Sequence, residues 1–454
     1  MDAMDSAPPQ DSSSYLPRWL EPAVRASVSG FPVTVVTGAR QVGKTTLLQN
    51  LEPGAAWKYL TLDDLATRAQ AKEDPGGLWA SGETVVIDEV QREPDLLLAV
   101  KQAVDQGGGG RFVLSGSANL LLMQHVSETL AGRAAYHVLA PLTAGEEKRA
   151  DAPLGILKKV LRGLPEEGLE GHLEGRPPKD AGGAGLDPRP LILRGFMPRV
   201  ALAGAELSPQ DWWDGYVATY LERDLRQLSD VSSLVDFRRV MQALALRTGR
   251  LLNQAEVGRD SGVSGPTLNR WLNLLEAGHL AVRLPAFAGN RTKRILKSPK
   301  LYWVDPALAA FLAGHWSLDS LSGSDEEGHL FENLIHHHLA VLARMLSPAG
   351  RLYHYREQSG LEVDFVLEHG RRLAAFEVKL SERVDYRDAR GLKAFVEGHP
   401  SCGAGLLVYA GDEVRRLGDR VTAVPWTLLA EGGSGGSPGT RHPRRHAQSQ
   451  NPVG

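Results

Sequence analysis

Residues 33–48 read Val-Thr-Val-Val-Thr-Gly-Ala-Arg-Gln-Val-Gly-Lys-Thr-Thr-Leu-Leu, and this stretch decides the fold of the first part of the chain. A β-branched run is followed by the pattern G-x-x-x-x-G-K-[ST], after which a helix begins. In such a unit the backbone N–H groups close around phosphates, and the helix N-terminus adds positive potential. We expect the Lys44 ammonium to contact the β and γ phosphates and the Thr45 hydroxyl to bind Mg²⁺. The alternative is a glycine-rich turn that binds nothing. The predicted phosphate cradle consists of Gly38, Ala39, Arg40, Gln41, Val42, Gly43, Lys44, Thr45 and Thr46.

Two further predicted strands end in acidic or polar residues. The apolar run at residues 84–88 ends in Asp88, which we expect to reach the metal, and Glu89 is a candidate base for the attacking water. The next strand ends near Ser117, which is expected either to hold the lytic water or to form part of a turn. Arg133 is either an arginine finger that neutralises charge on the γ phosphate or an ordinary surface arginine.

The composition of the 454 residues excludes several classes of protein. Lys plus Arg is 51 and Asp plus Glu is 54, and a net charge of −3 argues against a uniformly basic nucleic-acid-coating protein. The single cysteine, Cys402, excludes a disulfide framework and a cysteine-rich zinc site. No apolar run approaches about 18 residues, and the polar first 14 residues do not resemble a signal peptide. We therefore expect a cytoplasmic protein that does not span a membrane.

A basic module is predicted in the middle of the chain. Residues 253–275 read as two helices around a turn at Gly262, a pattern typical of a helix-turn-helix whose second helix enters a DNA major groove. Strands at 280–285 and 300–303 flank a loop, as in a wing. Over residues 247–303 ten bases and three acids give +7, which favours DNA over the alternative of a winged helix used for protein contact. The candidate DNA-binding residues are Asn269, Arg270, Asn273, Arg291, Lys293 and Arg294.

A β-hairpin is predicted from residue 361 to residue 380. A two-residue turn at Gly370-Arg371 pairs residue 369 with residue 372. This register places Asp364 opposite Glu377, with Cβ atoms about 5 Å apart. Lys379 then lies on the same face as Glu377, because side chains alternate along a strand.

Two opposed carboxylates destabilise a sheet unless a positive charge lies between them. That charge is either Lys379 or a divalent metal held by Asp364 and Glu377, with Glu332 from a preceding helix as a further ligand. Metal-dependent nucleases use such an arrangement, and the alternative is a half-exposed hairpin with a Glu–Lys pair. The run at residues 336–338 consists of three histidines, but successive helical residues point in different directions, so we do not expect one metal site there.

The order of these motifs resembles that of bacterial and archaeal AAA-type P-loop ATPases that end in a domain of unknown function with a restriction-endonuclease-like fold. The matching segments are Thr37–Leu47, Val86–Arg92, Leu114–Ser117, Ser127–Arg133, Pro141–Thr143, Arg194–Pro198, Tyr220–Asp224, Asn290–Arg291, Lys297–Tyr302, Phe331–Asn333, Glu362–Val366 and Glu377–Lys379.

This resemblance implies an α/β fold, with a P-loop NTPase parallel sheet covered by helices on both faces. A helical winged-helix domain and a small α/β restriction-endonuclease-like domain follow. It implies ATP and Mg²⁺ at Lys44, Thr45 and Asp88, and it makes Arg133 a γ-phosphate sensor. Cleavage is not implied, because this fold is often retained without activity. The expected division is a disordered N-terminus at 1–14, an ATPase domain at 15–150, a flexible insertion at 151–190, the helical and winged-helix domain at 191–315, the nuclease-like domain at 316–430 and a disordered tail at 431–454.

Three functions are compatible with these residues. The first is a Mg²⁺-dependent ATPase coupled to a DNA-binding winged helix and to cleavage by Asp364, Glu377 and Lys379. The second is an ATP-switched regulatory or binding protein with a catalytically silent nuclease-like domain. The third is an ATP-dependent signalling scaffold that touches no nucleic acid. ATP and DNA are the expected partners, and the residues leave open whether the chain forms a homo-oligomer.

Overall fold

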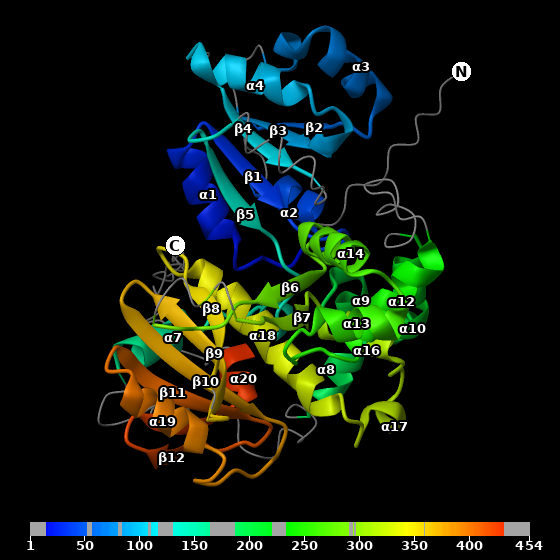
Figure 1. The fold of residues 1–454 in the computed structure, drawn as a ribbon. Helices are drawn as coiled ribbons and strands as arrows, with labels where there is room; N and C mark the ends of the chain where they lie inside the picture. The colour runs from blue at the N-terminus through cyan, green and yellow to red at the C-terminus, as the bar shows by residue number, and fades with distance from the viewer. Residues whose placement is uncertain are drawn as a thin grey trace, which may run out of the picture.

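The first strand, β1 (Val33–Thr37), lies inside a five-stranded parallel sheet in the computed structural model of the chain (Figure 1). The strand order is β2-β3-β4-β1-β5. The strands predicted at the β-branched run before the cradle, at 84–88 and shortly before Ser117 are confirmed as β1, β3 and β4, and β2 and β5 add one strand at each edge. The other strands are β2 (Lys58–Thr61), β3 (Thr84–Asp88), β4 (Arg111–Ser115) and β5 (Ala134–Val138). The structure describes residues 15–51, 57–79, 84–107, 110–116, 130–163, 187–219, 233–289, 294, 297–357 and 359–430.

Helices cover both faces of this sheet, as expected. Side chains alternate along β1, so Val36 packs with one layer of helices and Val35 with the other. The first layer contains α1 (Glu21–Gly30) and α2 (Lys44–Asn50). The second layer contains α3 (Leu65–Glu73), α4 (Leu96–Asp105) and the short helical turns Pro75–Leu78 and Val90–Arg92.

The chain leaves the first sheet through α6 (Ala144–Glu147) and α7 (Leu154–Arg162). The flexible insertion expected at 151–190 is wrong for its described first part, because α7 is a helix with one buried apolar face. The buried side chains of α7 pack against the C-terminal sheet and are Ile156, Leu157, Val160 and Leu161. Apolar residues at this spacing lie on one side of a helix. Residues 164–186 lie outside the described part of the chain.

The middle of the chain is mostly helical, with one antiparallel pair of strands, β6 (Ala281–Leu284) and β7 (Lys300–Trp303). The two helices predicted around Gly262 are α13 and α14. Gly262 has φ +72° at the end of α13, and the Ser264 side chain caps α14. The helices are α8 (Arg189–Arg194), α9 (Pro198–Leu202), the turn Gly204–Glu206, α10 (Pro209–Tyr216), α12 (Leu234–Ala245), α13 (Gln254–Ser261), α14 (Gly265–Ala277), α16 (Pro306–Ala313) and α17 (Leu318–Leu321).

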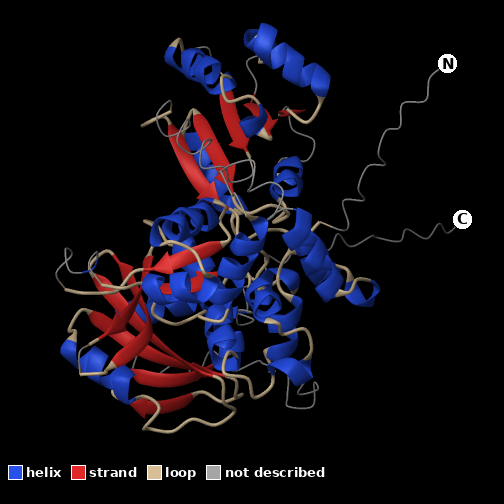
Figure 2. Ribbon diagram, turned by 45° about the vertical axis from the view of Figure 1, so that its right-hand side comes forward, coloured by secondary structure: helices blue, strands red, loops and turns tan. Residues whose placement is uncertain are grey.

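The C-terminal part is a mixed six-stranded sheet in the order β12-β13-β11-β10-β9-β8 (Figure 2). Helix α19 packs on one face, and α7, α18 and α20 pack on the other. The predicted hairpin register is confirmed, since His369 pairs with Arg372 and Phe365 with Phe376. The elements are α18 (Glu327–Met345), β8 (Arg351–Arg356), β9 (Glu362–His369), β10 (Arg372–Lys379), α19 (Arg390–Gly398), β11 (Cys402–Tyr409), β12 (Arg415–Gly418), β13 (Val421–Pro425) and α20 (Trp426–Ala430).

The three parts share one apolar core. A single cluster of buried side chains includes Leu47 of α2, Leu272 of α14, Leu334 of α18 and Phe376 of β10. The middle strands also reach the C-terminal sheet, because His354 N of β8 donates to Pro285 O at 3.0 Å, directly after β6. Within the described ranges, every helix is too short or too polar to cross a membrane.

Candidate nucleotide site and carboxylate cluster

The loop between β1 and α2 depends on backbone conformations that favour glycine. Gly38 has φ +148° and Gly43 has φ +92°. A Cβ atom added to Gly38 would lie 2.2 Å from the Leu139 carbonyl oxygen, so the loop backbone packs directly against the chain after β5. The turn made by these two glycines carries the chain from the carboxyl end of β1 into α2, whose first residue is Lys44.

Lys44 is buried against its own loop. Its ammonium donates to Gly38 O at 3.1 Å and to Ala39 O at 2.9 Å. Burial lowers the pKa of Lys44 to about 8, and the nearby carboxylates of Glu89 and Asp88 oppose this shift. A phosphate oxygen entering the loop would accept from the same ammonium and favour its charged form.

The two residues predicted to hold Mg²⁺ lie side by side. Thr45 Oγ1 donates to Asp88 Oδ2 at 2.6 Å, and Tyr59 donates to the same oxygen at 2.7 Å. A hydroxyl and a carboxylate are oxygen ligands that Mg²⁺ accepts beside nucleotide phosphates, so the residues present fit this ion. Glu89 follows with φ +58°, and its carboxylate accepts from the Gln91 amide.

Arg133 does not lie at the cradle of its own chain. Its carbonyl accepts from Val33 N at the beginning of β1, whereas the cradle follows the end of that strand. The rise along β1 separates the two by about 13 Å. The Arg133 guanidinium instead donates to Asp105 Oδ1 at 2.6 Å. Arg133 therefore does not reach the cradle of its own chain in this structure, and its role as a γ-phosphate sensor stays a prediction. Ser117 lies outside the described residues.

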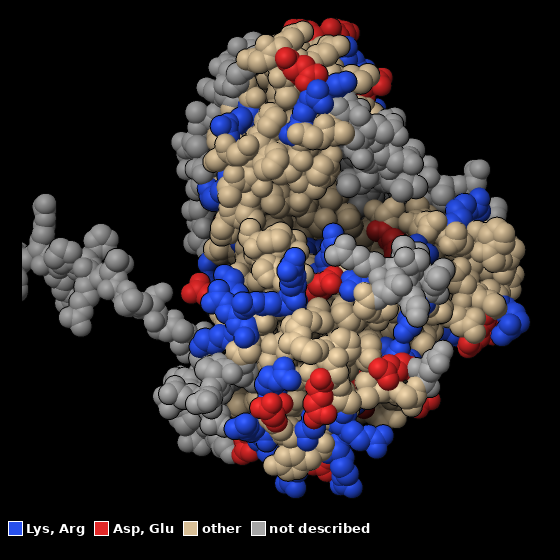
Figure 3. Space-filling model, turned by 60° about the vertical axis from the view of Figure 1, so that its left-hand side comes forward, with Lys and Arg blue, Asp and Glu red and all other residues tan. Residues whose placement is uncertain are grey.

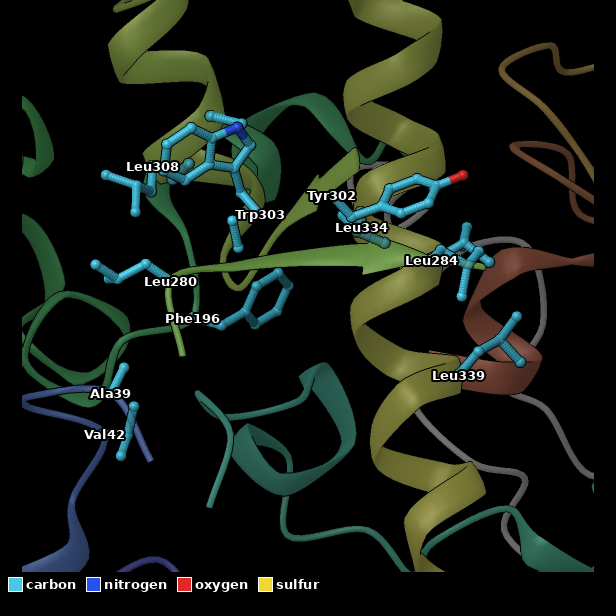
Figure 4. Close-up of a cluster of buried hydrophobic side chains, with 14 of the residues drawn as sticks. Ala39, Val42, Phe196, Leu280, Leu284, Tyr302, Trp303, Leu308, Leu334 and Leu339 are labelled. Carbon is cyan, nitrogen blue, oxygen red and sulfur yellow. The ribbon is translucent and has the colours of Figure 1, made fainter. Parts of the chain in front are cut away.

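The outer side of the cradle is built by distant segments that the sequence did not reveal. Arg18 donates to Val42 O at 2.9 Å and to Glu146 Oε1 at 3.2 Å. His279, directly after α14, lies 3.4 Å from Thr37 Oγ1 through Nε2, and burial lowers its pKa to about 4. Figure 4 shows Ala39 and Val42 on the same side of the buried cluster as Phe196 and Leu280. No local pattern marks Arg18 or His279, because their partners are remote in sequence.

The second helix of the predicted helix-turn-helix has one buried and one exposed side. Its apolar residues enter the core, whereas Asn269, Arg270 and Asn273 are exposed. Asn273 is also engaged locally, because its Oδ1 accepts from Arg283 at 2.7 Å. The predicted residues Arg291 and Lys293 lie outside the described part of the chain.

The +7 count over residues 247–303 does not describe an open basic surface. Arg294 is held away from solvent by a bidentate ion pair with Glu368, at 2.9 and 3.1 Å, and lies over the ring of Phe287. Lys300 is buried, and Arg283 is paired with Glu276. The prediction that Arg294 contacts DNA is therefore wrong for this structure, because its guanidinium is engaged by Glu368, which lies outside residues 247–303. On the face drawn in Figure 3, basic and acidic side chains interleave over the lower, C-terminal part.

The predicted carboxylate pair lies in a larger cluster with an unexpected lysine. Lys300 Nζ lies 2.9 Å from Glu332 Oε1, 2.9 Å from Glu362 Oε1 and 3.2 Å from Asp364 Oδ1. Burial alone lowers the pKa of Lys300, but the three carboxylates outweigh burial and raise it above its ordinary value. The same ammonium holds the pKa of Glu332 at about 2, against the effect of burial. In the sequence, Lys300 lies in the basic window and in the matching segment Lys297–Tyr302, and neither predicts that it pairs with these carboxylates.

The cluster does not fit the expected metal shell of Glu332, Asp364 and Glu377. Within the described ranges, no group of three acidic, histidine or cysteine side chains has the arrangement of a metal site. Glu377 Oε1 accepts from Lys379 at 2.8 Å, and Oε2 is buried without a partner among the described residues. Burial, and then the charge of Asp364, raise the pKa of Glu377. The prediction of this metal centre is wrong for the structure, because an ammonium ion lies among its carboxylates.

The three successive histidines of α18 face different partners. The ring of His336 stacks on Tyr302 with centroids 4.4 Å apart. His337 Nε2 donates to Leu142 O at 2.8 Å, and His338 Nε2 accepts from Ala144 N at 3.1 Å. The predicted divergence of these side chains is confirmed, and two of them join α18 to the segment that leaves the first sheet.

Three family models match successive parts of the chain. Residues 30–147 match an AAA domain, residues 187–319 match a domain of unknown function (DUF8612), and residues 327–429 match a second domain of unknown function (DUF4143). An uncharacterized protein of Mycobacterium bovis and another of Mycobacterium tuberculosis are each 29% identical over 413 residues. The alignment covers 90% of this chain and 84% of each relative.

Solved structures with similar chains include a Walker-type ATPase of Pyrococcus abyssi. That structure is 17% identical, with a TM-score of 0.44 and coverage of 68% of this chain and 99% of its own. A signal transduction ATPase with numerous domains from Pyrococcus horikoshii is 13% identical, with a TM-score of 0.24 and coverage of 72% of this chain and 45% of its own.

Proposed function

Starting from the AAA-type P-loop ATPase domain at residues 30–147, we propose that this chain binds ATP with Mg²⁺ at residues 38–46 and hydrolyses it. The observation that carries the proposal is the 2.6 Å contact between Thr45 Oγ1 and Asp88 Oδ2 beside the loop that holds Lys44. Two oxygen ligands and an ammonium converge there at the start of a helix, and together they complement a nucleotide triphosphate.

Each residue has a separate task in this proposal. Lys44 exchanges its two loop carbonyls for β- and γ-phosphate oxygens, and Thr45 and Asp88 hold Mg²⁺. When bound, Mg²⁺ neutralises charge that develops on the phosphates. Glu89 orients the attacking water and accepts its proton. Arg133 has no role in the cradle of its own chain, because it lies at the amino end of β1 and the cradle follows the carboxyl end.

The first test compares Lys44→Ala with Lys72→Ala in the full chain. Lys72 is exposed on α3 and pairs with Glu93 at 3.4 Å, so the control removes the same charge from the same domain. We expect ATP turnover to fall roughly a hundredfold or more in Lys44→Ala, the loss typical of removing a group that stabilises transition-state charge, and to be unchanged in Lys72→Ala. Equal turnover in the two variants and the wild type would exclude this site.

As a second function we propose that α14 binds duplex DNA. The supporting observation is that Asn269 and Arg270 are exposed on the second helix of the turn, while the opposite side of α14 is buried. An exposed arginine and asparagine at this place suit base edges and phosphates in a major groove. Cleavage is not part of the proposal, because Lys300 pairs with the carboxylates expected to hold the metal.

The DNA proposal is tested by fluorescence anisotropy with a labelled 30-base-pair duplex at two salt concentrations. Replacing Asn269 and Arg270 together by alanine is expected to weaken binding roughly tenfold or more, because both groups face the groove. Lys158→Ala, an exposed lysine on α7, serves as the charge control. Wild-type protein that binds no duplex, or a double variant that binds as tightly as the control, would refute the proposal.

A further inference from the structure

The ammonium group of Lys300 is buried and surrounded by carboxylates, as a bound metal cation would be. An ammonium ion has three protons, and Lys300 Nζ lies within 3.2 Å of three carboxylates, one on α18 and two on β9. The Lys300 side chain is only 4% exposed, so water does not compete for these contacts. All three donors of the ammonium can thus be used at once by acidic partners.

We propose that Lys300, on β7 in the middle part of the chain, takes the place of a divalent cation in this cluster, so that its ammonium group holds together the acidic residues of the C-terminal part. The cluster then takes up a divalent metal such as Mn²⁺ only when Lys300 is removed. The proposal is independent of the proposed nucleotide and DNA functions, because none of its residues has a role in either function and it is tested without either ligand.

The remaining oxygens of the cluster support this assignment. Asp364 Oδ2 accepts from Val378 N at 2.9 Å, and Glu362 has a second cation, Arg356, at 3.7 Å. Glu377 is paired with Lys379. Glu377 Oε2 is without a partner among the described residues, but a metal ion entering beside it would lie close to the ammonium groups of Lys300 and Lys379, which carry charge of the same sign. Oxygen ligands bind Mg²⁺ or Mn²⁺ at about 2.0–2.2 Å, which leaves no room for both cations.

Lys300 is fixed rather than free to swing away. Its strand β7 pairs with β6, and all four side chains of β7 are buried. The Asn333 side chain accepts from Trp303 N at 2.7 Å and donates to Trp303 O at 3.0 Å, which fastens β7 to α18. Tyr302 also donates to Glu332, so the lysine and one of its carboxylates belong to the same packed unit.

The experiment measures Mn²⁺ binding to the full chain by calorimetry in the absence of nucleotide. The variants are Asp364→Asn, Lys300→Met and the double variant, with Asp88→Asn as a control that removes an acid at the other site. We expect the wild type and Asp364→Asn to bind Mn²⁺ alike. We expect Lys300→Met to gain one site at least tenfold tighter than any in the wild type, and the double variant to lose it.

Two results would overturn the proposal. One is a wild-type Mn²⁺ site that disappears in Asp364→Asn but persists in Asp88→Asn, because Lys300 would then share the cluster with metal. The other is a folded Lys300→Met that gains no site. If Lys300→Met does not fold alone, it is refolded with and without Mn²⁺. Recovery only with Mn²⁺ supports the proposal, and equal failure in both refutes it.

Discussion

Gly38 shows how closely the phosphate cradle is packed at the level of one residue. Its φ of +148° is strained for any side chain, and a Cβ atom would lie 2.2 Å from Leu139 O. We predict that Gly38→Ala lowers the free energy of unfolding by about 2–4 kcal/mol, the sum of backbone strain and a steric clash. Chemical denaturation measures this change, and a fluorescent ATP analogue measures the accompanying loss of nucleotide affinity.

The control for this substitution is Gly30→Ala at the end of α1. A Cβ atom there meets nothing within 4 Å, and the change is expected to stay within about 0.5 kcal/mol of the wild type. A Gly38→Ala protein as stable as Gly30→Ala would show that Leu139 moves aside easily and that the loop is not held as described.

At the scale of elements, α18 joins the parts of the chain. Within seven residues it offers Glu332 to Lys300, Asn333 to the backbone of β7, and His337 and His338 to the segment after β5. Successive residues on a helix point in different directions, so one buried helix can contact three neighbours. These four polar residues can be buried because each of the neighbours supplies a hydrogen-bond partner.

The elements whose signals are local could be predicted from the sequence. The strand before the cradle, the turn at Gly262 and the hairpin register at His369 and Arg372 each depend on a few adjacent residues, and all are observed. Period-two alternation and turn chemistry fix such features without knowledge of the rest of the fold.

The environments of Lys300 and Arg294 could not be predicted in this way. Both are bases in a window of net charge +7, yet their acidic partners lie 32 to 74 residues further along the chain. Helix α7 was missed for a related reason. Its surroundings in the sequence are rich in Gly and Pro, and its apolar face has meaning only against the C-terminal sheet. Composition averages over sequence neighbours, whereas ion pairs and packing are set by neighbours in space.

At the scale of the whole molecule, buried histidines join the first and last parts. His338 Nδ1 donates to Leu334 O at 2.9 Å while Nε2 accepts from Ala144 N, and only the neutral ring can make both contacts. The segment after Ala144 continues to Glu146, which binds Arg18 and through it the cradle carbonyl of Val42. A charge placed on His338 would therefore break the contact between α18 and the support of the cradle.

This arrangement predicts a pH dependence of stability. Burial lowers the pKa of His337 to about 4 and that of His338 to about 3, both well below the value of about 6.5 in an unfolded chain. Between these limits the unfolded state binds more protons, so the free energy of unfolding falls as the pH falls from 6.5.

Glutamine at both positions can still donate to Leu142 O and accept from Ala144 N but cannot titrate. Between pH 7.5 and 5.5 the wild type should lose about 2–3 kcal/mol more than this double variant in chemical denaturation, since each pKa unit corresponds to about 1.4 kcal/mol. Acidic groups titrate in both proteins and cancel in the difference. A double variant that keeps the wild-type slope would show that these two histidines accept protons in the folded chain.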